Sequence, residues 1–207
     1  MNPLRHSLTL ALSIICLAAP LHAEEPEAGF TALFDGKSLT DWKISGNPEG
    51  FKVEDGAIVT KGDCSHAFYT GKFRDGKFAS YELRLDVMTR EHSNGGVFIN
   101  SQFQEKGWPA KGYEIQVNNT QSDWKKSGGV YNFQDNKVPL KDNEWMHYVI
   151  RVEGGKVVVT IDGKEISNFT PKEGESRLTK EGGAIALQAH DKNSTVLYKN
   201  IRIKPLD

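Results

Sequence analysis

Cysteine is scarce in this chain of 207 residues, which holds only Cys16 and Cys64. Cys16 lies in an N-terminal stretch that we expect to be removed, so the mature chain would keep a single cysteine. It could then form no internal disulfide. Its stability must therefore come from a hydrophobic core, and a remainder of about 184 residues is long enough to bury one.

Long apolar runs are also lacking, apart from the one between Leu8 and Ala19. Arg5 and His6 precede this run, and Leu21 to Ala23 closes it with small residues. A spanning helix would need about 20 apolar residues, so a membrane anchor is disfavoured. The pattern predicts a cleaved signal peptide over residues 1–23 and an exported mature protein, secreted or periplasmic.

The chain has no excess of charge of either sign. It carries 26 Lys and Arg against 27 Asp and Glu, for a net charge of -1. Proteins that bind nucleic acid or anionic membranes concentrate basic residues, and none are concentrated here. Metal-binding spacings such as H-x-x-x-H or C-x-x-C are absent too. The composition excludes nucleic acid as a partner, and it neither requires nor excludes a divalent metal ion.

Helical periodicity is missing, whereas hairpin signals are frequent. No segment repeats apolar residues at intervals of three and four over three turns, which excludes a doubly wound α/β sheet. Asp-Gly pairs with apolar alternation around them are a strong hairpin signal. These pairs and one Gly-Gly pair predict turns at Asp35, Asp55, Asp75, Gly154 and Asp162. We predict an all-β domain over residues 24–207, a two-sheet antiparallel jelly-roll sandwich with one concave face.

Polar residues alternate with apolar ones in three predicted strands. Successive side chains of a strand point to opposite faces. Glu114 and Gln116 in GYEIQV therefore share one face, as do Gln188 and His190 in IALQAH. In YELRLDV, Arg84 lies between two acidic residues on one face. We expect all three strands to present these groups on a single sheet surface, while His66, in a loop-like stretch, is expected at the surface.

The four tryptophans divide into two pairs. Trp108 and Trp124 fall in two long loops, Ser101 to Lys111 and Asn118 to Gly128, where an indole plane could stack on a sugar ring. The other two, Trp42 and Trp145, are expected in the core.

Several stretches resemble, in order and spacing, the 3-keto-disaccharide hydrolase family, long catalogued as a domain of unknown function. They are FTALFDGKSLTDWK, SNGGVFINS, GYEIQV, NEWMHYVIRVEGGKVVVTIDG and GGAIALQAHDKNSTVLYKNIRIKPL. The resemblance spans roughly Phe30 to Leu206 and implies a fold similar to concanavalin A-like lectins and glucanases. It also implies an activity, cleavage of a glycoside oxidised at C3, in which a base removes the C2 proton and the C1 substituent is eliminated.

On this resemblance Glu114 is the candidate base, and His190 is the candidate proton donor or enolate partner. Gln116 and Gln188 would hydrogen-bond sugar hydroxyls. The other candidates for sugar binding are Asn94, Asn100, Arg84, Trp108 and Trp124. Each also has an ordinary explanation: a solvated strand glutamate, a histidine that merely ends a strand, exposed amides, or a self-paired row of charges. Non-catalytic carbohydrate binding is the alternative function.

Three positions depart from the family's pattern. Asn100 stands where the family often has arginine, Asn118 or Asn119 where an aspartate often follows, and Met146 where asparagine is frequent. The changes at Asn100 and Asn118 would remove a cation and an anion from the site, and so bear on which substrate is accepted.

Overall fold

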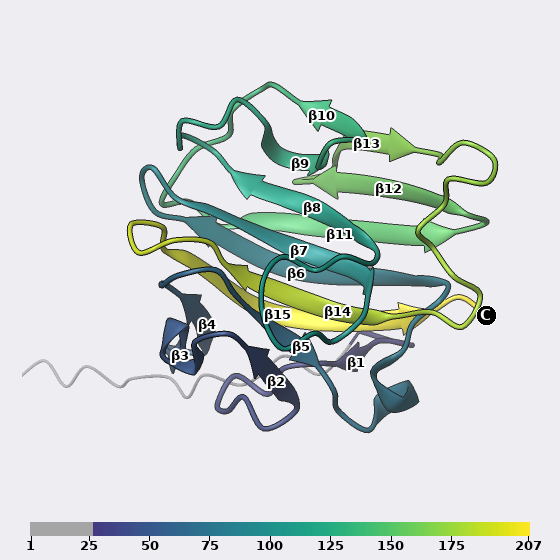
Figure 1. Ribbon diagram of the computed structural model, residues 1–207, viewed down its shortest axis with the longest axis horizontal. Helices are drawn as coiled ribbons and strands as arrows, with labels where there is room; N and C mark the ends of the chain where they lie inside the picture. The colour runs from purple at the N-terminus through teal and green to yellow at the C-terminus, as the bar shows by residue number, and fades with distance from the viewer. Residues whose placement is uncertain (1–26) are drawn as a thin grey trace, which may run out of the picture.

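The computed structural model describes residues 27–207, and these are built almost wholly of strands. The predicted signal peptide, at residues 1–23, lies outside them. Two antiparallel sheets stack face to face (Figure 1), so the predicted all-β sandwich is confirmed. Short 3-10 turns, η1 (Pro48–Gly50) and η2 (Phe73–Gly76), are the helical segments of the described part. No helix within residues 27–207 is long and apolar enough to cross a membrane.

One sheet has eight strands. In spatial order they are β13 (Lys164–Phe169), β12 (Lys156–Ile161), β11 (Met146–Glu153), β6 (Tyr81–Thr89), β15 (Val196–Pro205), β4 (Ala57–Thr60) and β3 (Phe51–Glu54), with β1 (Thr31–Ala32) paired to β15. The seven-stranded sheet runs β10 (Gln134–Asn136), β9 (Lys126–Val130), β8 (Tyr113–Asn118), β7 (Asn94–Ser101), β14 (Ala184–Ala189), β5 (Ser65–Tyr69) and β2 (Trp42–Ser45).

The core fills the space between the sheets, because every long strand turns its apolar side chains to the same interior. On β6 the residues Tyr81, Leu83, Leu85 and Val87 are fully buried and alternate with partly exposed charged residues. On β8 the inward set is Tyr113, Ile115 and Val117. Burial of each such side chain contributes about 1.5–3 kcal/mol, which explains a stable fold with one free cysteine, Cys64.

Three of the predicted turns are confirmed as hairpins. Asp55-Gly56 joins β3 to β4, Gly154-Gly155 joins β11 to β12, and Asp162-Gly163 joins β12 to β13. Both residues of each pair have positive φ, the conformation that a two-residue hairpin turn requires.

The hairpin predicted at Asp75 is wrong. Asp75 and Gly76 do have positive φ, but they lie in η2. This segment follows β5 of the seven-stranded sheet and leads to β6 of the eight-stranded one. The local turn signal was therefore correct, but the chain crosses between sheets here, and the flanking strands do not pair. Asp35-Gly36 lies beyond the end of β1 and forms no hairpin either, since β2 belongs to the other sheet.

The placement predicted for Arg84 is also wrong. β6 lies in the eight-stranded sheet, so Arg84 faces outward on the side opposite to Glu114. There it forms ion pairs with Glu82 and with Glu27. Alternation along a strand fixes which residues share a face of that strand. It does not determine which sheet the strand joins.

Trp42 is buried, as expected, and its indole N–H donates to Leu33 O at 3.0 Å. Trp145, expected in the core, is 37% exposed instead. It immediately precedes β11, and the ammonium of Lys199 lies 4.0 Å from its ring centroid. An indole at the strand entrance is thus covered by a cation of β15 rather than by the core.

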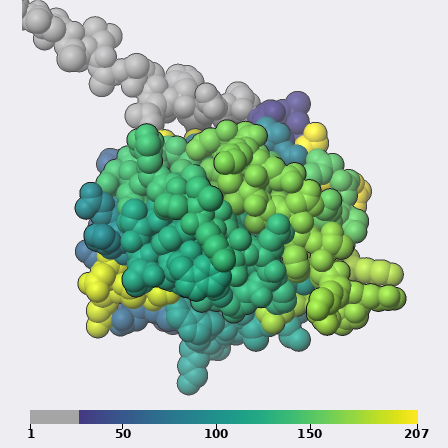
Figure 2. All heavy atoms as spheres, turned by 90° about the horizontal axis from the view of Figure 1, so that it is seen from above, coloured from purple at the N-terminus to yellow at the C-terminus, as the bar shows by residue number. Residues whose placement is uncertain are grey.

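Seen from above, in Figure 2, the teal and green atoms around β9 and β10 lie beside the yellow-green atoms of β13 and the segment after it. β13 contacts both β9 and β10, so the two sheets meet along this edge of the sandwich. The β7–β8 connection, residues 102–112, crosses the outer face of the seven-stranded sheet, and it loops over the front of the molecule in Figure 1. That connection borders the candidate site.

Candidate functional site

A cavity of about 450 Å³ opens on the outer face of the seven-stranded sheet. It is lined by Asn94, Glu114, Gln116, Gln188 and His190, by Phe98, Trp108, Pro109, Gly112 and Tyr113, and by Asp123, Tyr131, Asn132, Phe133 and Arg177. The four residues that shared parity predicted on one face, Glu114, Gln116, Gln188 and His190, do line this one cavity. Their chemical roles stay predictions.

Strand register explains why Glu114 and Gln188 meet. Glu114 of β8 pairs with Phe98 of β7, and Phe98 pairs with Ala186 of β14, two residues before Gln188. The amide Nε2 of Gln188 donates to Glu114 Oε1 at 3.0 Å. Gly96 makes room for this contact, since a Cβ there would lie 2.4 Å from Glu114 Oε1. The second glycine of the SNGGVFIN run thus leaves space for the carboxylate.

Glu114 has an unusual acidity for a glutamate. Removal of its carboxylate from water by burial raises the pKa of Glu114 to about 7, although the hydrogen bond from Gln188 acts in the opposite direction. Asp123 raises this pKa further, and Lys125 lowers it. A carboxylate of this pKa, facing a cavity, is suited to accept a proton near neutral pH.

His190 follows the last residue of β14 and is held by its neighbour. Its Nδ1 lies 2.7 Å from Asp191 Oδ2, which also accepts from the hydroxyl of Ser194 at 2.8 Å. Burial alone would raise the pKa of Asp191, but the hydrogen bonds from Ser194 and His190 outweigh it and keep this pKa below its usual value. An ionised Asp191 orients the imidazole and leaves its Nε2 as the nitrogen free for a ligand.

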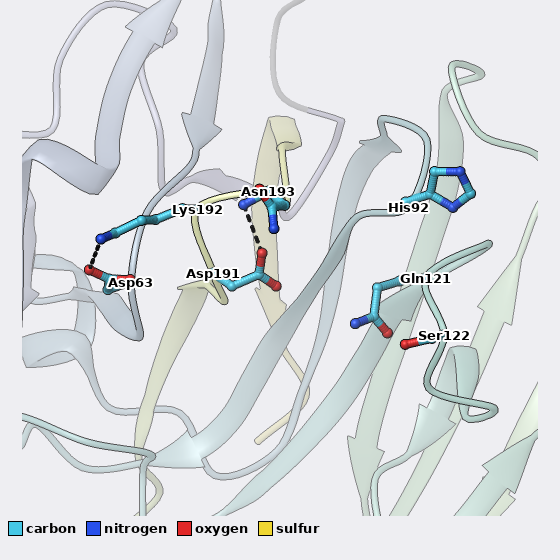
Figure 3. Close-up of a pocket in the computed structure, with 7 residues that line it drawn as sticks. All are labelled: Asp63, His92, Gln121, Ser122, Asp191, Lys192 and Asn193. Atoms are coloured by element: carbon cyan, nitrogen blue, oxygen red, sulfur yellow. Dashed lines mark hydrogen bonds and ion pairs between the residues drawn. The ribbon is translucent and has the colours of Figure 1, made fainter.

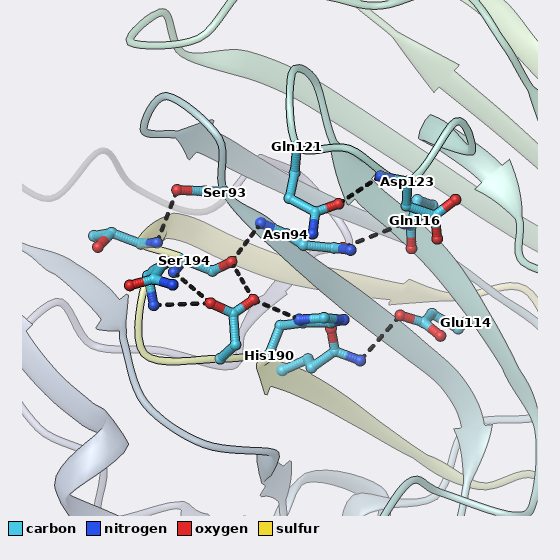
Figure 4. A network of polar contacts seen from close by, with 12 residues as sticks. Ser93, Asn94, Glu114, Gln116, Gln121, Asp123, His190 and Ser194 are labelled. Atoms are coloured by element: carbon cyan, nitrogen blue, oxygen red, sulfur yellow. Dashed lines mark hydrogen bonds and ion pairs between the residues drawn. The ribbon is translucent and has the colours of Figure 1, made fainter.

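A polar network joins the two ends of the cavity (Figure 4). The hydroxyl of Ser194 accepts from the backbone N–H of Asn94 at 2.9 Å. Asn94 Oδ1 in turn accepts from Gln116 Nε2 at 3.2 Å. The Oε1 of Gln116 is buried and has no hydrogen-bond partner among residues 27–207. The network therefore fixes Asn94 and Gln116 and leaves one amide oxygen available to accept a bond from a ligand.

Of the two loop tryptophans, the structure brings only Trp108 to the cavity. Its ring centroid lies 5.3 Å from that of His190, and 51% of the side chain is exposed. Trp124 is equally exposed, at 52%, but lies outside the cavity lining, with the ammonium groups of Lys125 and Lys137 near its ring.

Asn100 is likewise not brought to the cavity. It is buried, its Oδ1 accepts from the backbone N–H of Thr179 at 3.0 Å, and its Nδ2 points to Phe78 O at 3.5 Å. It holds the segment before β14 against the end of β7. Asn118 and Asn119 serve similarly, donating to backbone carbonyls of the neighbouring loops. None of these three asparagines lines the cavity.

Sequence reasoning missed several residues of the cavity wall. Tyr131 and Arg177 come from loops, and nothing in an irregular segment indicates where its side chains point. Phe98 could have been found, because it has the parity of Asn94 within one strand. His66, expected at the surface, is instead fully buried in β5. Polar and apolar residues alternate too weakly in the run SHAFY to distinguish a strand from a loop.

A second hollow lies at the loop ends of the sandwich (Figure 3). Asp63 and Lys192 form an ion pair at 3.4 Å on one side of it, and His92 and Gln121 lie on the other. It adjoins the site through Asp191. No group of three or more His, Cys, Asp or Glu side chains in the described part of the chain is arranged to hold a metal ion.

Comparison with known proteins identifies one family. The model described as the 3-keto-alpha-glucoside-1,2-lyase-like domain matches residues 29–204. No curated protein matches the chain. The match covers both sheets and every residue of the cavity.

Solved structures share the fold at low sequence identity. A protein from Parabacteroides distasonis described as a putative glycosyl hydrolase is 24% identical, with a TM-score of 0.69, over 86% of this chain and 94% of that one. The carbohydrate-binding module CBM66 from Bacillus subtilis is 14% identical, with a TM-score of 0.53, over 85% and 95%. The VIP36 exoplasmic/lumenal domain is 8% identical, with a TM-score of 0.59, over 86% and 89%. These likenesses establish the concanavalin A-like jelly roll.

Proposed function

Because the chain belongs to the 3-keto-alpha-glucoside-1,2-lyase-like family, we propose that its cavity cleaves glycosides already oxidised at C3. The observation that carries this proposal is Glu114, a carboxylate with a pKa of about 7 that faces a cavity lined by amides and aromatic rings. A ketone at C3 acidifies the proton at C2, so a base of this strength is sufficient for the first step.

Glu114 removes the C2 proton. The electron pair of the C2–H bond forms a C2=C3 double bond, and the ketone becomes an enolate. Gln188 already donates to Glu114 Oε1, which holds the carboxylate in one orientation. The side chain therefore needs no reorganisation when it accepts the proton, and such preorganisation contributes to rate.

The enolate then expels the substituent at C1. The ketone at C3 re-forms, the C2=C3 electron pair shifts to a C1=C2 double bond, and the C1–O bond breaks with its electron pair going to the leaving oxygen. His190, with Asp191 at its Nδ1, supplies a proton to the leaving oxygen. Water adds across the double bond: its hydroxyl goes to C1, its remaining proton returns to His190, and the proton held by Glu114 goes back to C2. The balance is one glycoside and one water consumed, with one 3-keto sugar and one alcohol formed.

The polar network and Trp108 bind the sugar. The free Oε1 of Gln116 accepts from a hydroxyl, and the half-exposed indole packs on the face of the ring. Residues 1–23 direct export, so the reaction takes place outside the cytoplasm, in the periplasm or the medium.

A non-catalytic carbohydrate-binding module is the second candidate. The similarity in fold to CBM66 favours it, because that protein has the same sandwich as a binding module. In that case Glu114 and His190 only hydrogen-bond sugar. The two functions differ in whether the C1–O bond breaks.

The test is incubation of residues 24–207 with methyl 3-keto-α-glucoside, with methanol and 3-ketoglucose followed by NMR. Release of both, in equal amounts, supports the enzyme. Saturable binding without release supports the binding module. A parallel sample with a chelator reports on metal, and loss of activity there would add a divalent ion to the mechanism.

A further inference from the structure

Glu114 and Tyr131 are neighbours on two adjacent strands. β8 pairs with β9 through Ile115 and Val130, and one step beyond that pair the backbone N–H of Tyr131 donates to Glu114 O at 2.9 Å. Residues opposite each other in an antiparallel pair project from the same face, with Cβ atoms about 4.5–5.5 Å apart. Glu114 faces the cavity, so the phenol of Tyr131 lies beside it, and both residues line the cavity.

The hydroxyl of Tyr131 has only one weak hydrogen bond. It donates to Asp123 Oδ2 at 3.4 Å, whereas an O–H···O bond is usually about 2.5–3.0 Å long. The ring is well held, because the ammonium of Lys125 lies 4.1 Å from its centroid. Burial, and then the charge of Asp123, raise the pKa of Tyr131, so the phenol keeps its proton. The cavity therefore contains a positioned donor that can turn to a better acceptor.

The proposed reaction leaves one charge without a partner. When Glu114 takes the C2 proton, negative charge develops on the C3 oxygen, and preorganised hydrogen-bond donors stabilise such an oxyanion. The buried amide atoms of the cavity that have no partner within residues 27–207 are Gln116 Oε1 and Gln188 Oε1. Both are acceptors and would repel an oxyanion. The Nε2 groups of the same two amides already donate, to Asn94 and to Glu114. The donor must therefore come from another side chain.

The order of the side chains across the sheet matches the order of the carbon atoms in the sugar. β9 lies on one side of β8, and β7 and β14 lie on the other (Figure 1). In the direction across the strands, Glu114 is therefore between Tyr131, which follows β9, and His190, which follows β14. In the sugar, C2 is likewise between C1 and C3. With His190 at the C1 oxygen and Glu114 at the C2 hydrogen, Tyr131 is on the side of the C3 oxygen.

We propose that the hydroxyl of Tyr131 donates a hydrogen bond to the C3 oxygen of the sugar and stabilises the enolate, which makes Tyr131 a catalytic residue. The inference rests on the proposed function, because it completes that reaction. As the electron pair of the C2–H bond forms the C2=C3 bond, the carbonyl pair moves to the C3 oxygen and the hydrogen bond strengthens. Tyr131 keeps its proton, and the bond weakens again when the ketone re-forms. Lys125 adds positive charge on the same side, since it also lowers the pKa of Glu114.

Tyr131→Phe tests the proposal, because it removes one oxygen atom and leaves the ring. With methyl 3-keto-α-glucoside, kcat should fall about a hundredfold. KM should stay within about threefold of the parent, since the lost bond is strong only in the enolate. The control is Tyr81→Phe, which removes the same atom from β6 of the other sheet. The hydroxyl of Tyr81 has no partner in the described chain, so this variant should keep the kcat of the parent. Equal kcat for Tyr131→Phe and its control would overturn the proposal.

A second measurement needs no turnover. In a Glu114→Gln background, the ¹³C signal of methyl 3-keto-α-glucoside labelled at C3 should move downfield on binding, because a hydrogen bond polarises the C=O bond. Adding Tyr131→Phe should abolish this displacement, and adding Tyr81→Phe should not. The same displacement with and without the Tyr131 hydroxyl would overturn the proposal even if kcat had fallen, because the loss of activity would then be structural.

Failure here is distinguishable from failure of the proposed function. If the parent chain, with Glu114 intact, releases no methanol but the carbonyl displacement depends on Tyr131, the catalytic proposal fails and the contact with the C3 oxygen stands. If the parent and Tyr131→Phe cleave the substrate equally fast, the assignment of Tyr131 fails and the enzyme stands. If the sugar does not bind at all, both fail.

Discussion

At the scale of a single residue, the protonation state of Glu114 links activity and stability to pH. As a base Glu114 must be ionised, so the acid limb of the kcat/KM profile should have its midpoint near pH 7. In the folded protein this pKa is raised from 4.5, so the folded state keeps a proton that the unfolded chain loses between about 4.5 and 7. Stability from this group is thus present below pH 4.5 and lost as pH rises through 7.

The corresponding prediction is a difference in stability between the parent protein and Glu114→Gln that changes with pH. Relative to the variant, the parent should lose roughly 1–3 kcal/mol of unfolding free energy between pH 4.5 and pH 8. Urea unfolding at several pH values measures this difference. A constant difference across the range would mean that the carboxylate is not desolvated.

At the scale of the element, β7 supports the site because it has no side chain at Gly96, next to Glu114. Gly96→Ala would place a methyl group 2.4 Å from Glu114 Oε1 and displace the carboxylate. We expect turnover to fall at least tenfold with little change in Tm, since only a side chain must move. The control is Gly50→Ala, where the nearest atom is 3.6 Å away, and it should retain full activity. Equal activity of the two variants would contradict the placement of Glu114.

The β8–β9 connection supplies the next prediction. Asn119 Nδ2 donates to Thr89 Oγ1 and Lys141 O, both at 2.8 Å, and its Oδ1 accepts from Ser127 at 2.7 Å. Asn119→Asp removes both donors in a fully buried position. We expect a loss of about 2–4 kcal/mol in thermal or urea unfolding.

Asn47→Asp is the control for this variant. Asn47 is exposed, and its Oδ1 only accepts from the N–H of Glu49 at 3.0 Å, which an aspartate does as well. It should be neutral in the same unfolding measurement. If Asn119→Asp were neutral too, the loop would not depend on these hydrogen bonds.

Most of the strands, and the side chains that share one face of each strand, could be predicted from the sequence. Alternation at Glu114 and Gln188 gave the correct face, because one side of each strand must be apolar. The pairing of strands that are far apart in the sequence could not be predicted, because nothing near Arg84 or Asp75 specifies which sheet the next strand joins. The positions of the loop side chains could not be predicted for another reason. Arg177 and Tyr131 reach the cavity through irregular segments, and their directions depend on the whole packed structure.

At the scale of the whole molecule, the cavity lies on the seven-stranded sheet, and the eight-stranded sheet packs on the other side of the core. Arg84 lies on the outer face of the eight-stranded sheet, with the core between it and the cavity. Arg84→Ala should leave kcat/KM within twofold of the parent. Its ion pairs with Glu82 and Glu27 are partly exposed, so the loss of stability should stay below about 1 kcal/mol. A tenfold loss of activity would instead place Arg84 in substrate binding.

In the proposed mechanism, cleavage depends on one proton transfer from C2 to Glu114. The most direct measurement of that step is exchange of the C2 hydrogen of methyl 3-keto-α-glucoside in D₂O, followed by NMR together with cleavage. The parent protein should exchange or cleave the substrate, and Glu114→Gln should do so at least a hundredfold more slowly while still binding it. Equal rates for the two proteins would contradict the assignment of Glu114 as the base.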